Sequence, residues 1–266
     1  MATTIPETRL VAWWDEPAPG PENMAADEVL ADEAVARGCL VVRLYGWLTP
    51  AVSLGGFQRL ADAEACPAIA GLPIVRRPSG GGAILHGSDL TYAVAVPRDH
   101  PWGGDPQILY DAFHESLAAE LRDRGVAAAL HPGRDRAAGD ESRLLCFDRR
   151  ARGDLVVQAT GRDPDGHKIM GSAQRRLRGA VLQHGSLLTT SLARVAEPAR
   201  HPGLVQLHPA AAGWDLRGLV AAWLGRMAAA AAAPLELRPE SFRADRGGAI
   251  AARAARFREA AWLARR

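Results

Sequence analysis

The amino-acid sequence predicts an α+β fold in which helices pack on a central sheet. Residues 40–45 are rich in β-forming residues, and residues 89–96 alternate between apolar and other side chains, as is typical of strands. Residues 106–124 instead carry apolar side chains at helical spacing. With 266 residues, 48% of them hydrophobic, the chain can bury one large core, so we expect residues 1–266 to form a single domain.

Cap and turn residues place the elements of the first half of the chain. Asn23 is expected to cap a helix that ends at Gly38. Asp105 is expected to cap a second helix that ends before Gly125. Strands are expected at residues 40–45, 50–54, 74–77 and 89–96.

The second half is expected to add more strands and then helices. Strands are predicted at residues 144–147, 155–159, 167–170 and 180–188. From about residue 190 the composition shifts to alanine and arginine, which predicts C-terminal packing helices. Asp215 is expected to cap one of them, and residues 250–263 have the spacing of another.

The composition excludes several functional classes. The net charge is only +2 and the charges are interspersed, so nucleic-acid binding is not expected. No window approaches the roughly 18 apolar residues of a membrane span, and the N-terminus has no signal-peptide pattern. The three cysteines lack the spacing of a zinc site or a disulfide framework. We therefore expect a cytoplasmic protein with no metal site and no membrane partner.

Lys168 is a candidate functional residue on composition alone. It is the one lysine among 32 basic residues, and all the others are arginine. A surface position would accept arginine almost freely, whereas a site that needs a compact ammonium would not. Chance survival of one lysine is the alternative.

The densest chemical signal is the segment from Arg76 to His86. Three consecutive glycines, Gly80, Gly81 and Gly82, leave backbone N–H groups accessible and allow close approach of a ligand. Arg76, Arg77, Ser79 and His86 add charge and hydrogen-bond donors. A flexible glycine hairpin is the structural alternative, but the flanking arginines and histidine favour a ligand site.

A second signal surrounds Lys168. The lysine is expected at the start of a strand, and Gly171, Ser172 and Ala173 follow it closely. These small residues again permit close approach of a ligand. His184 lies on the next predicted strand. A lone histidine beside a strand is more often structural, but two such segments around one predicted hairpin favour a site.

These segments resemble the lipoate-protein ligase and octanoyltransferase superfamily, which is related in fold to biotin-protein ligases. The similar segments are RRPSGGGAILHGSDLTYAV, HKIMGSAQRR, LQHGSLL and ENMAADEVL. They run in consistent order between about residues 10 and 190. The resemblance is closest to the cysteine-dependent octanoyltransferases.

The resemblance implies a central mixed, largely antiparallel sheet flanked by helices, and a hydrophobic tunnel for an acyl tail with Lys168 at its mouth. Lys168 would stabilise negative charge on the acyl group during transfer. The residues expected to bind acyl substrate are Arg76, Arg77, Ser79, Gly80, Gly81, Gly82, His86, Gly171, Ser172, Ala173 and His184.

Cys146 decides between two reactions that the resemblance allows. In a transferase it would take octanoate from acyl carrier protein as a thioester and pass it to a lysine of a lipoyl domain or glycine-cleavage H protein, without a cofactor. Lys168 would favour the thiolate. Cys146 also fits a buried strand over residues 144–147 as a small apolar filler. Cys39 and Cys66 have no comparable context.

Gly82 favours the other reaction. Transferases with a cysteine at this place more usually have arginine after two glycines, whereas three glycines are typical of the ligases, which use ATP and magnesium to make an acyl-adenylate. Octanoyl transfer is our first prediction and ATP-dependent lipoate ligation the second. A homologue that binds acyl groups without catalysis is the third.

Overall fold

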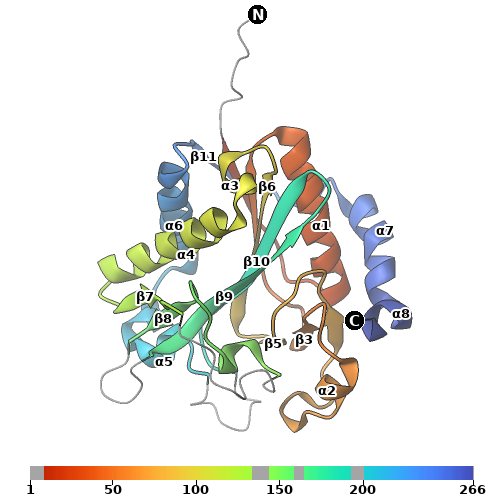
Figure 1. The fold of residues 1–266 in the computed structure, drawn as a ribbon. Coiled ribbons are helices and arrows are strands. Elements are labelled where there is room, and N and C mark those ends of the chain that lie inside the picture. The colour runs from red at the N-terminus through yellow and green to blue at the C-terminus, as the bar shows by residue number, and fades with distance from the viewer. Residues whose placement is uncertain (1–8, 134–143, 159–164, 193–200, 266) are drawn as a thin grey trace, which may run out of the picture.

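The computed structural model describes residues 9–133, 144–158, 165–192 and 201–265. Its centre is an eight-stranded sheet (Figure 1). The strands, in spatial order, are β11 (Leu235–Arg238), β1 (Leu10–Trp14), β2 (Leu40–Tyr45), β6 (Asp89–Pro97), β10 (Ala180–Leu188), β9 (His167–Arg176), β8 (Leu155–Val157) and β7 (Ala128–Leu130). β1 pairs in parallel with β2 and β11, and the other neighbours are antiparallel. The predicted mixed, largely antiparallel sheet is confirmed.

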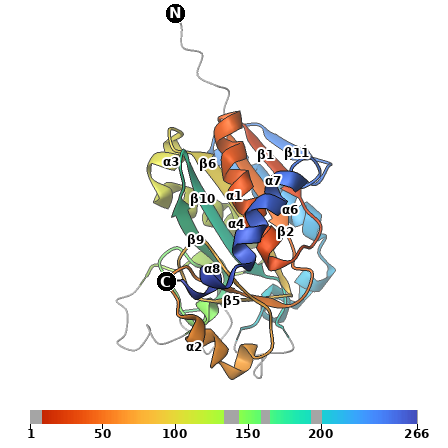
Figure 2. The same cartoon turned by 90° about the vertical axis from the view of Figure 1, so that its right-hand side faces the viewer.

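Helices cover both faces of this sheet (Figures 1 and 2). The four long ones are α1 (Gly20–Arg37), α4 (Pro106–Asp123), α6 (Leu216–Ala230) and α7 (Gly247–Arg258). Alternate strand residues point to opposite faces, so Val11 and Val41 join the core under α1 and α7, while Leu10 and Val42 join the core under α4 and α6. No helix in the described ranges has the length and apolar character to cross a lipid bilayer.

A small three-stranded sheet carries the glycine-rich segment. Its strands are, in order, β4 (Ile74–Arg76), β3 (Ala51–Leu54) and β5 (Ile84–His86). The glycines therefore form the connection between β4 and β5. The short helices are α2 (Leu60–Glu64), α3 (Pro101–Gly104), α5 (Leu204–Leu207) and α8 (Ala260–Ala264), and 3-10 turns lie at Pro67–Ile69, Cys146–Asp148 and Pro209–Gly213.

Several predicted boundaries are confirmed and one predicted cap is wrong. Gly38 ends α1 with φ of 64°, and the side chains of Asp105 and Asp215 cap α4 and α6. Asn23 does not cap α1, which begins at Gly20. Its side-chain nitrogen instead donates to the carbonyl oxygens of Ala18 and Gly46, because the residue is buried inside the first turns.

Other differences concern strands at the edges and the end of the chain. The strand predicted at residues 144–147 is reduced to one bridge between Ala83 and Leu145, followed by the turn Cys146–Asp148. β8 ends at Val157, and residue 159 lies outside the described ranges. The helix predicted over residues 250–263 is divided at Glu259 into α7 and α8. β1 and β11 were not predicted.

A buried arginine ties α1 to the sheet. Arg43 on β2 forms ion pairs with Asp15 and Asp27, and all three side chains are inaccessible to solvent. The guanidinium also donates to the side-chain oxygen of Asn23 at 2.8 Å. Burial lowers the pKa of Arg43, but Asp27 and Asp15 raise it above the ordinary arginine value overall. The buried guanidinium therefore has two carboxylates and an amide oxygen as partners.

Arg43→Met is expected to lower the free energy of unfolding by about 3–5 kcal/mol, because it leaves two buried carboxylates without their cation. Urea denaturation followed by tryptophan fluorescence measures the loss. The control is Arg253→Met, which removes a partly exposed pair with Asp32 and is expected to cost less than about 1 kcal/mol. Equal effects of the two substitutions would contradict the assignment.

Candidate active site

Cys146 and Lys168 meet where the glycine-rich segment approaches β9. Lys168 is the second residue of β9, and its Nζ lies 3.4 Å from Cys146 Sγ. The same nitrogen lies 2.8 Å from Asp154 Oδ2 and 3.4 Å from the backbone oxygens of Cys146 and Arg149. A thiol, a carboxylate and two carbonyl groups therefore surround one ammonium.

Lys168 is charged although it is buried. The residue is 7% exposed. Burial by itself lowers the pKa of the Lys168 ammonium, but its interactions with Cys146 and Asp154 oppose this and raise the pKa above the ordinary lysine value. The side chain consequently provides a fixed positive charge beside the sulfur at neutral pH.

Gly171 provides the space for the Lys168 side chain. A Cβ atom on Gly171 would lie 2.5 Å from Lys168 Cε and 2.7 Å from its Nζ. The sequence predicted a close approach at this position, and the structure shows that the approaching group is the lysine on the same strand. Any larger residue would displace the ammonium from Cys146.

The glycine-rich segment is held from two sides. The Arg77 guanidinium donates to the backbone oxygens of Gly80 and Gly82, both at 2.9 Å. Burial lowers the pKa of Arg77 to about 10, so it stays protonated at neutral pH. On the other side, Cys146 N donates to Ala83 O at 2.7 Å. A backbone hydrogen bond thus connects the glycine-rich segment to Cys146.

Gly82 has no room for a side chain in this arrangement. A Cβ atom there would lie 2.9 Å from the backbone N and Cα of Cys146, and 3.0 Å from Nη2 of Arg149. The guanidinium of Arg149 therefore occupies the space into which a residue at position 82 would extend. Although the chain has glycine at position 82, it carries an arginine at position 149 that lies beside Cys146.

Two cavities meet at Cys146. The inner cavity reaches towards Met24, Tyr45 and Trp47. The outer cleft opens past Gln58 and Tyr110. Predicted site residues that line the inner cavity are Arg77, Gly81, His86, Cys146, Gly171, Ser172, Ala173 and His184. Those that line the outer cleft are Gly81, Gly82, Cys146, Lys168 and Ser172.

Three predicted site residues line neither of these cavities. Arg76 donates to the carbonyl oxygens of Gly55, Gln58 and Leu263, and so fixes neighbouring segments. The Ser79 hydroxyl contacts Nε2 of His184. Gly80 lies under the ring of Phe57. All three therefore contact neighbouring parts of the chain and do not line these cavities.

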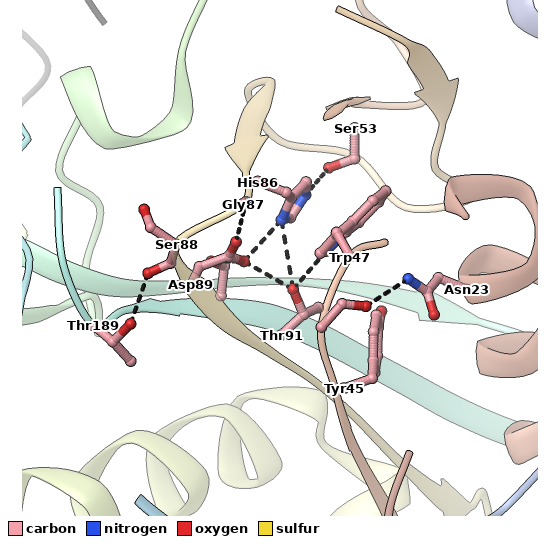
Figure 3. Close-up of polar contacts among 12 residues, drawn as sticks. Asn23, Tyr45, Trp47, Ser53, His86, Gly87, Ser88, Asp89, Thr91 and Thr189 are labelled. Carbon is pink, nitrogen blue, oxygen red and sulfur yellow. Dashed lines mark hydrogen bonds and ion pairs between the residues drawn. The ribbon is translucent and has the colours of Figure 1, made fainter. Parts of the chain in front are cut away.

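The two predicted histidines are held in buried polar networks. His86 Nε2 lies 2.7 Å from Ser53 Oγ and its Nδ1 lies 2.8 Å from Asp89 Oδ2 (Figure 3). Trp47 stacks on the His86 ring at 3.9 Å between centroids. Burial lowers the pKa of His86 below its ordinary value, although Asp89 opposes the shift. A neutral His86 therefore lines the inner cavity.

His184 has a similar environment. Its Nδ1 lies 3.0 Å from Asp27 Oδ2, and Asp27 also accepts a hydrogen bond from Tyr45 at 2.8 Å. Because Asp27 pairs with Arg43 as well, a continuous polar chain connects the core under α1 to Ser79. Both ring nitrogens of His184 therefore have partners within the protein, as expected of a structural histidine.

Asp154, Tyr110 and His114 complete the site and were not predicted. Tyr110 donates to Asp154 Oδ1 at 3.1 Å, which orients the carboxylate towards Lys168. His114 Nδ1 donates to Gly153 O at 2.7 Å, and its Nε2 contacts Ser172 Oγ. In the sequence Asp154 is one acidic residue after a basic cluster, and no local pattern distinguishes it.

Comparisons with known proteins place the chain in a family. Residues 19–198 match the family model described as the lipoyl protein ligase A/B catalytic domain. The chain belongs to this family. Within the described residues of this lipoyl protein ligase A/B domain, no group of three or more His, Cys, Asp and Glu is arranged to hold a metal ion.

Curated relatives of the domain include two octanoyltransferases named LipM. The protein from Symbiobacterium thermophilum is 42% identical over 178 residues, covering 64% of this chain and 61% of its own length. The protein from Kyrpidia tusciae is 40% identical, covering 62% of this chain and 61% of its own length. The chain thus spans about three fifths of the length of these relatives.

Solved structures show the same fold at low sequence identity. A putative lipoate protein ligase from T. acidophilum with bound lipoic acid has a TM-score of 0.69 and 19% identity, covering 97% of this chain and 99% of that one. A lipoate-protein ligase A bound with ATP has a TM-score of 0.70 and 18% identity, covering 97% and 98%. The predicted superfamily is confirmed by these findings together.

Lys168→Met is expected to slow alkylation of Cys146 by iodoacetamide at pH 7 by about tenfold or more, because the thiolate loses its counter-charge. Peptide mass spectrometry measures the rate at Cys146 separately from Cys39 and Cys66. Since the substitution also leaves Asp154 unpaired, the double variant Lys168→Met/Asp154→Asn is measured beside it. An unchanged rate in both variants would show that the ammonium does not activate the sulfur.

The free energy of unfolding is expected to decrease as the pH is lowered from 6.5 to about 4, because of His114. Burial lowers the pKa of this histidine from 6.5 to about 4. In that window the unfolded chain binds a proton that the folded protein excludes, so the free energy of unfolding rises with pH, by about 3 kcal/mol across the window. Urea denaturation at several pH values measures the slope. His114→Gln should reduce it, and an identical slope would refute the assignment.

Proposed function

We propose that this chain transfers an octanoyl group from acyl carrier protein to a lysine of a lipoyl domain or of glycine-cleavage H protein, through a thioester on Cys146. The observation that carries the proposal is the position of Lys168 Nζ between Cys146 Sγ and Asp154. The identity to proteins named octanoyltransferase supports it. The free state of Cys39, Cys66 and Cys146 suits a reducing cytoplasm.

In the first half-reaction, the Cys146 thiolate attacks the carbonyl carbon of the donor thioester. The new carbon–sulfur bond forms as the bond to the donor sulfur breaks, and the donor leaves as a thiolate that takes a proton from solvent. Lys168 stabilises the attacking thiolate and the negative charge that develops on the acyl oxygen. The acyl tail would occupy the inner cavity, whose lining includes Met24, Trp47 and Ile84.

In the second half-reaction, the neutral amine of the acceptor lysine attacks the Cys146 thioester. An amide bond forms, Cys146 leaves as a thiolate beside Lys168, and the amine proton passes to solvent. Asp154 keeps the ammonium at its place during both steps, because it accepts from Lys168 and is itself oriented by Tyr110. This route needs no cofactor.

ATP-dependent lipoate ligation is the second candidate. The three glycines at positions 80–82 favour it, and a solved structure of similar fold is bound with ATP. In that reaction ATP and magnesium would activate free lipoate, and Cys146 would have no covalent role. A homologue that only binds acyl groups is a third candidate, but a non-catalytic binder would not need the ammonium beside the sulfur.

The protein is mixed with an apo lipoyl domain and either octanoyl acyl carrier protein or lipoate with ATP and magnesium, and both proteins are weighed by mass spectrometry. We expect the octanoyl donor to modify the acceptor and to leave an octanoyl adduct on Cys146. Cys146→Ser should abolish transfer, at least about a thousandfold, whereas the control Cys66→Ser should transfer normally. Modification by lipoate only when ATP is present, unchanged in Cys146→Ser, would establish the ligase instead.

A further inference from the structure

The C-terminal helix α8 lies against β4 of the small sheet but adds little to the hydrophobic core (Figure 2). None of its five residues is buried, although Trp262 packs partly against the core. The preceding helix α7 differs, because it buries Ile250, Ala254 and Phe257. Burial of apolar surface therefore explains the position of α7 but not that of α8.

The helix α8 instead holds Arg76, the last residue of β4. Arg76 is inaccessible to solvent, and its Nε donates to the carbonyl oxygen of Leu263 at 2.7 Å. In the other direction, Nε1 of Trp262 donates to the carbonyl oxygen of Arg76 at 3.0 Å. The helix thus binds both the side chain and the backbone of the residue that leads into the glycine-rich turn.

Arg76 depends on these contacts because its charge has little other support. Within the described ranges its side chain donates to three carbonyl oxygens and forms no ion pair with a carboxylate. Its Nη2 is buried there and has no hydrogen-bond partner. A buried cation that is stabilised by carbonyl dipoles alone is sensitive to the loss of any one of them. The carbonyl group of Leu263 is therefore a requirement for the position of Arg76.

The other end of the Arg76 guanidinium holds the loop of residues 55–58. Its Nη1 donates to the carbonyl oxygens of Gly55 and Gln58 at 2.9 and 2.8 Å. This loop packs closely on the glycine-rich turn, because a Cβ atom on Gly55 would lie 2.0 Å from the carbonyl oxygen of Gly81. Arg76 therefore connects α8 to a loop that touches the turn directly.

Hydrogen bonds fasten this loop to both ends of the turn. Gly56 N donates to Ser79 O at 2.7 Å, just before the three glycines. Nε2 of Gln58 donates to Leu144 O at 2.9 Å, and Ala83 N, just after the glycines, donates to the same oxygen at 2.9 Å. One loop whose position depends on Arg76 thus supports the turn from both sides.

We propose that Trp262 and Leu263 are positioning residues for acyl transfer, which act through Arg76 to hold the glycine-rich turn in place. Gly81 of this turn lines both the inner cavity and the outer cleft, so a shift of the turn changes the space for an acyl group. The inference rests on the proposed octanoyl transfer. It assigns a role to residues outside the range 19–198 that matches the family model.

The test uses Trp262→Ala and the conservative variant Trp262→Phe, which keeps an aromatic ring but lacks the N–H donor. Acylation of Cys146 by octanoyl-pantetheine, a small thioester, is followed by mass spectrometry. We expect Trp262→Ala to raise KM about fivefold or more and Trp262→Phe to raise it about twofold to threefold, with a smaller loss of kcat. Alkylation of Cys146 by iodoacetamide should stay within about twofold of the wild type, because Lys168 keeps its own contacts.

Arg253→Met is the matched control, because it removes an ion pair of the same C-terminal segment with Asp32 and no contact with Arg76. It should behave as the wild type. Alkylation of the buried Cys39 in the same samples shows whether a variant has unfolded, and Trp262→Phe decides the question if Trp262→Ala has done so. An unchanged KM in the folded Trp262 variants, or a loss confined to kcat, would overturn the proposal.

Hydrogen exchange distinguishes failure of this proposal from failure of the proposed function. Backbone amides of residues 77–83 should exchange faster in both Trp262 variants than in the wild type and in Arg253→Met, whereas those of β6 and β10 should not change. If octanoyl-pantetheine does not acylate wild-type Cys146, the proposed function fails, and hydrogen exchange then decides whether α8 holds the turn. Unchanged exchange at residues 77–83 would overturn the proposal in either case.

Discussion

The site depends on one buried ammonium whose charge is balanced within hydrogen-bonding distance. Lys168 is buried, and an unpaired cation in a buried position would be strongly unfavourable. Asp154 provides the compensating carboxylate at 2.8 Å, and the sulfur of Cys146 lies 3.4 Å from the same ammonium. The position of Asp154 is in turn fixed by Tyr110 from α4. The chemistry of the sulfur therefore follows from how β8, β9 and α4 pack.

The glycines of the candidate site serve the packing of this chain. Gly171 leaves space for the Lys168 side chain, and Gly82 leaves space for the Cys146 backbone and the Arg149 guanidinium. Arg77 holds the glycine-rich turn by its carbonyl groups from inside the core. These contacts explain how two segments distant in sequence, around residues 80 and 168, are held next to each other at Cys146.

Patterns local in the sequence predicted much of the fold and the centre of the site. Richness in β-forming residues located β2, alternation located β6, and cap chemistry located the starts of α4 and α6. The single lysine identified Lys168. Contacts between distant residues were not predictable in this way. Asn23 is a residue type that often caps helices, but here its side chain binds the backbone of Ala18. Asp154 reaches Lys168 only because β8 pairs with β9. β1 and β11 are short strands whose partners lie far away in sequence.

The bonds around Arg76 have a consequence for how the protein is made. Arg76 donates to Leu263 O, and its own carbonyl accepts from Trp262 Nε1 at 3.0 Å. The strand that leads into the glycine-rich turn thus obtains two partners from residues more than 180 positions later in the chain. During synthesis these two hydrogen bonds cannot form until residues 262 and 263 have been made.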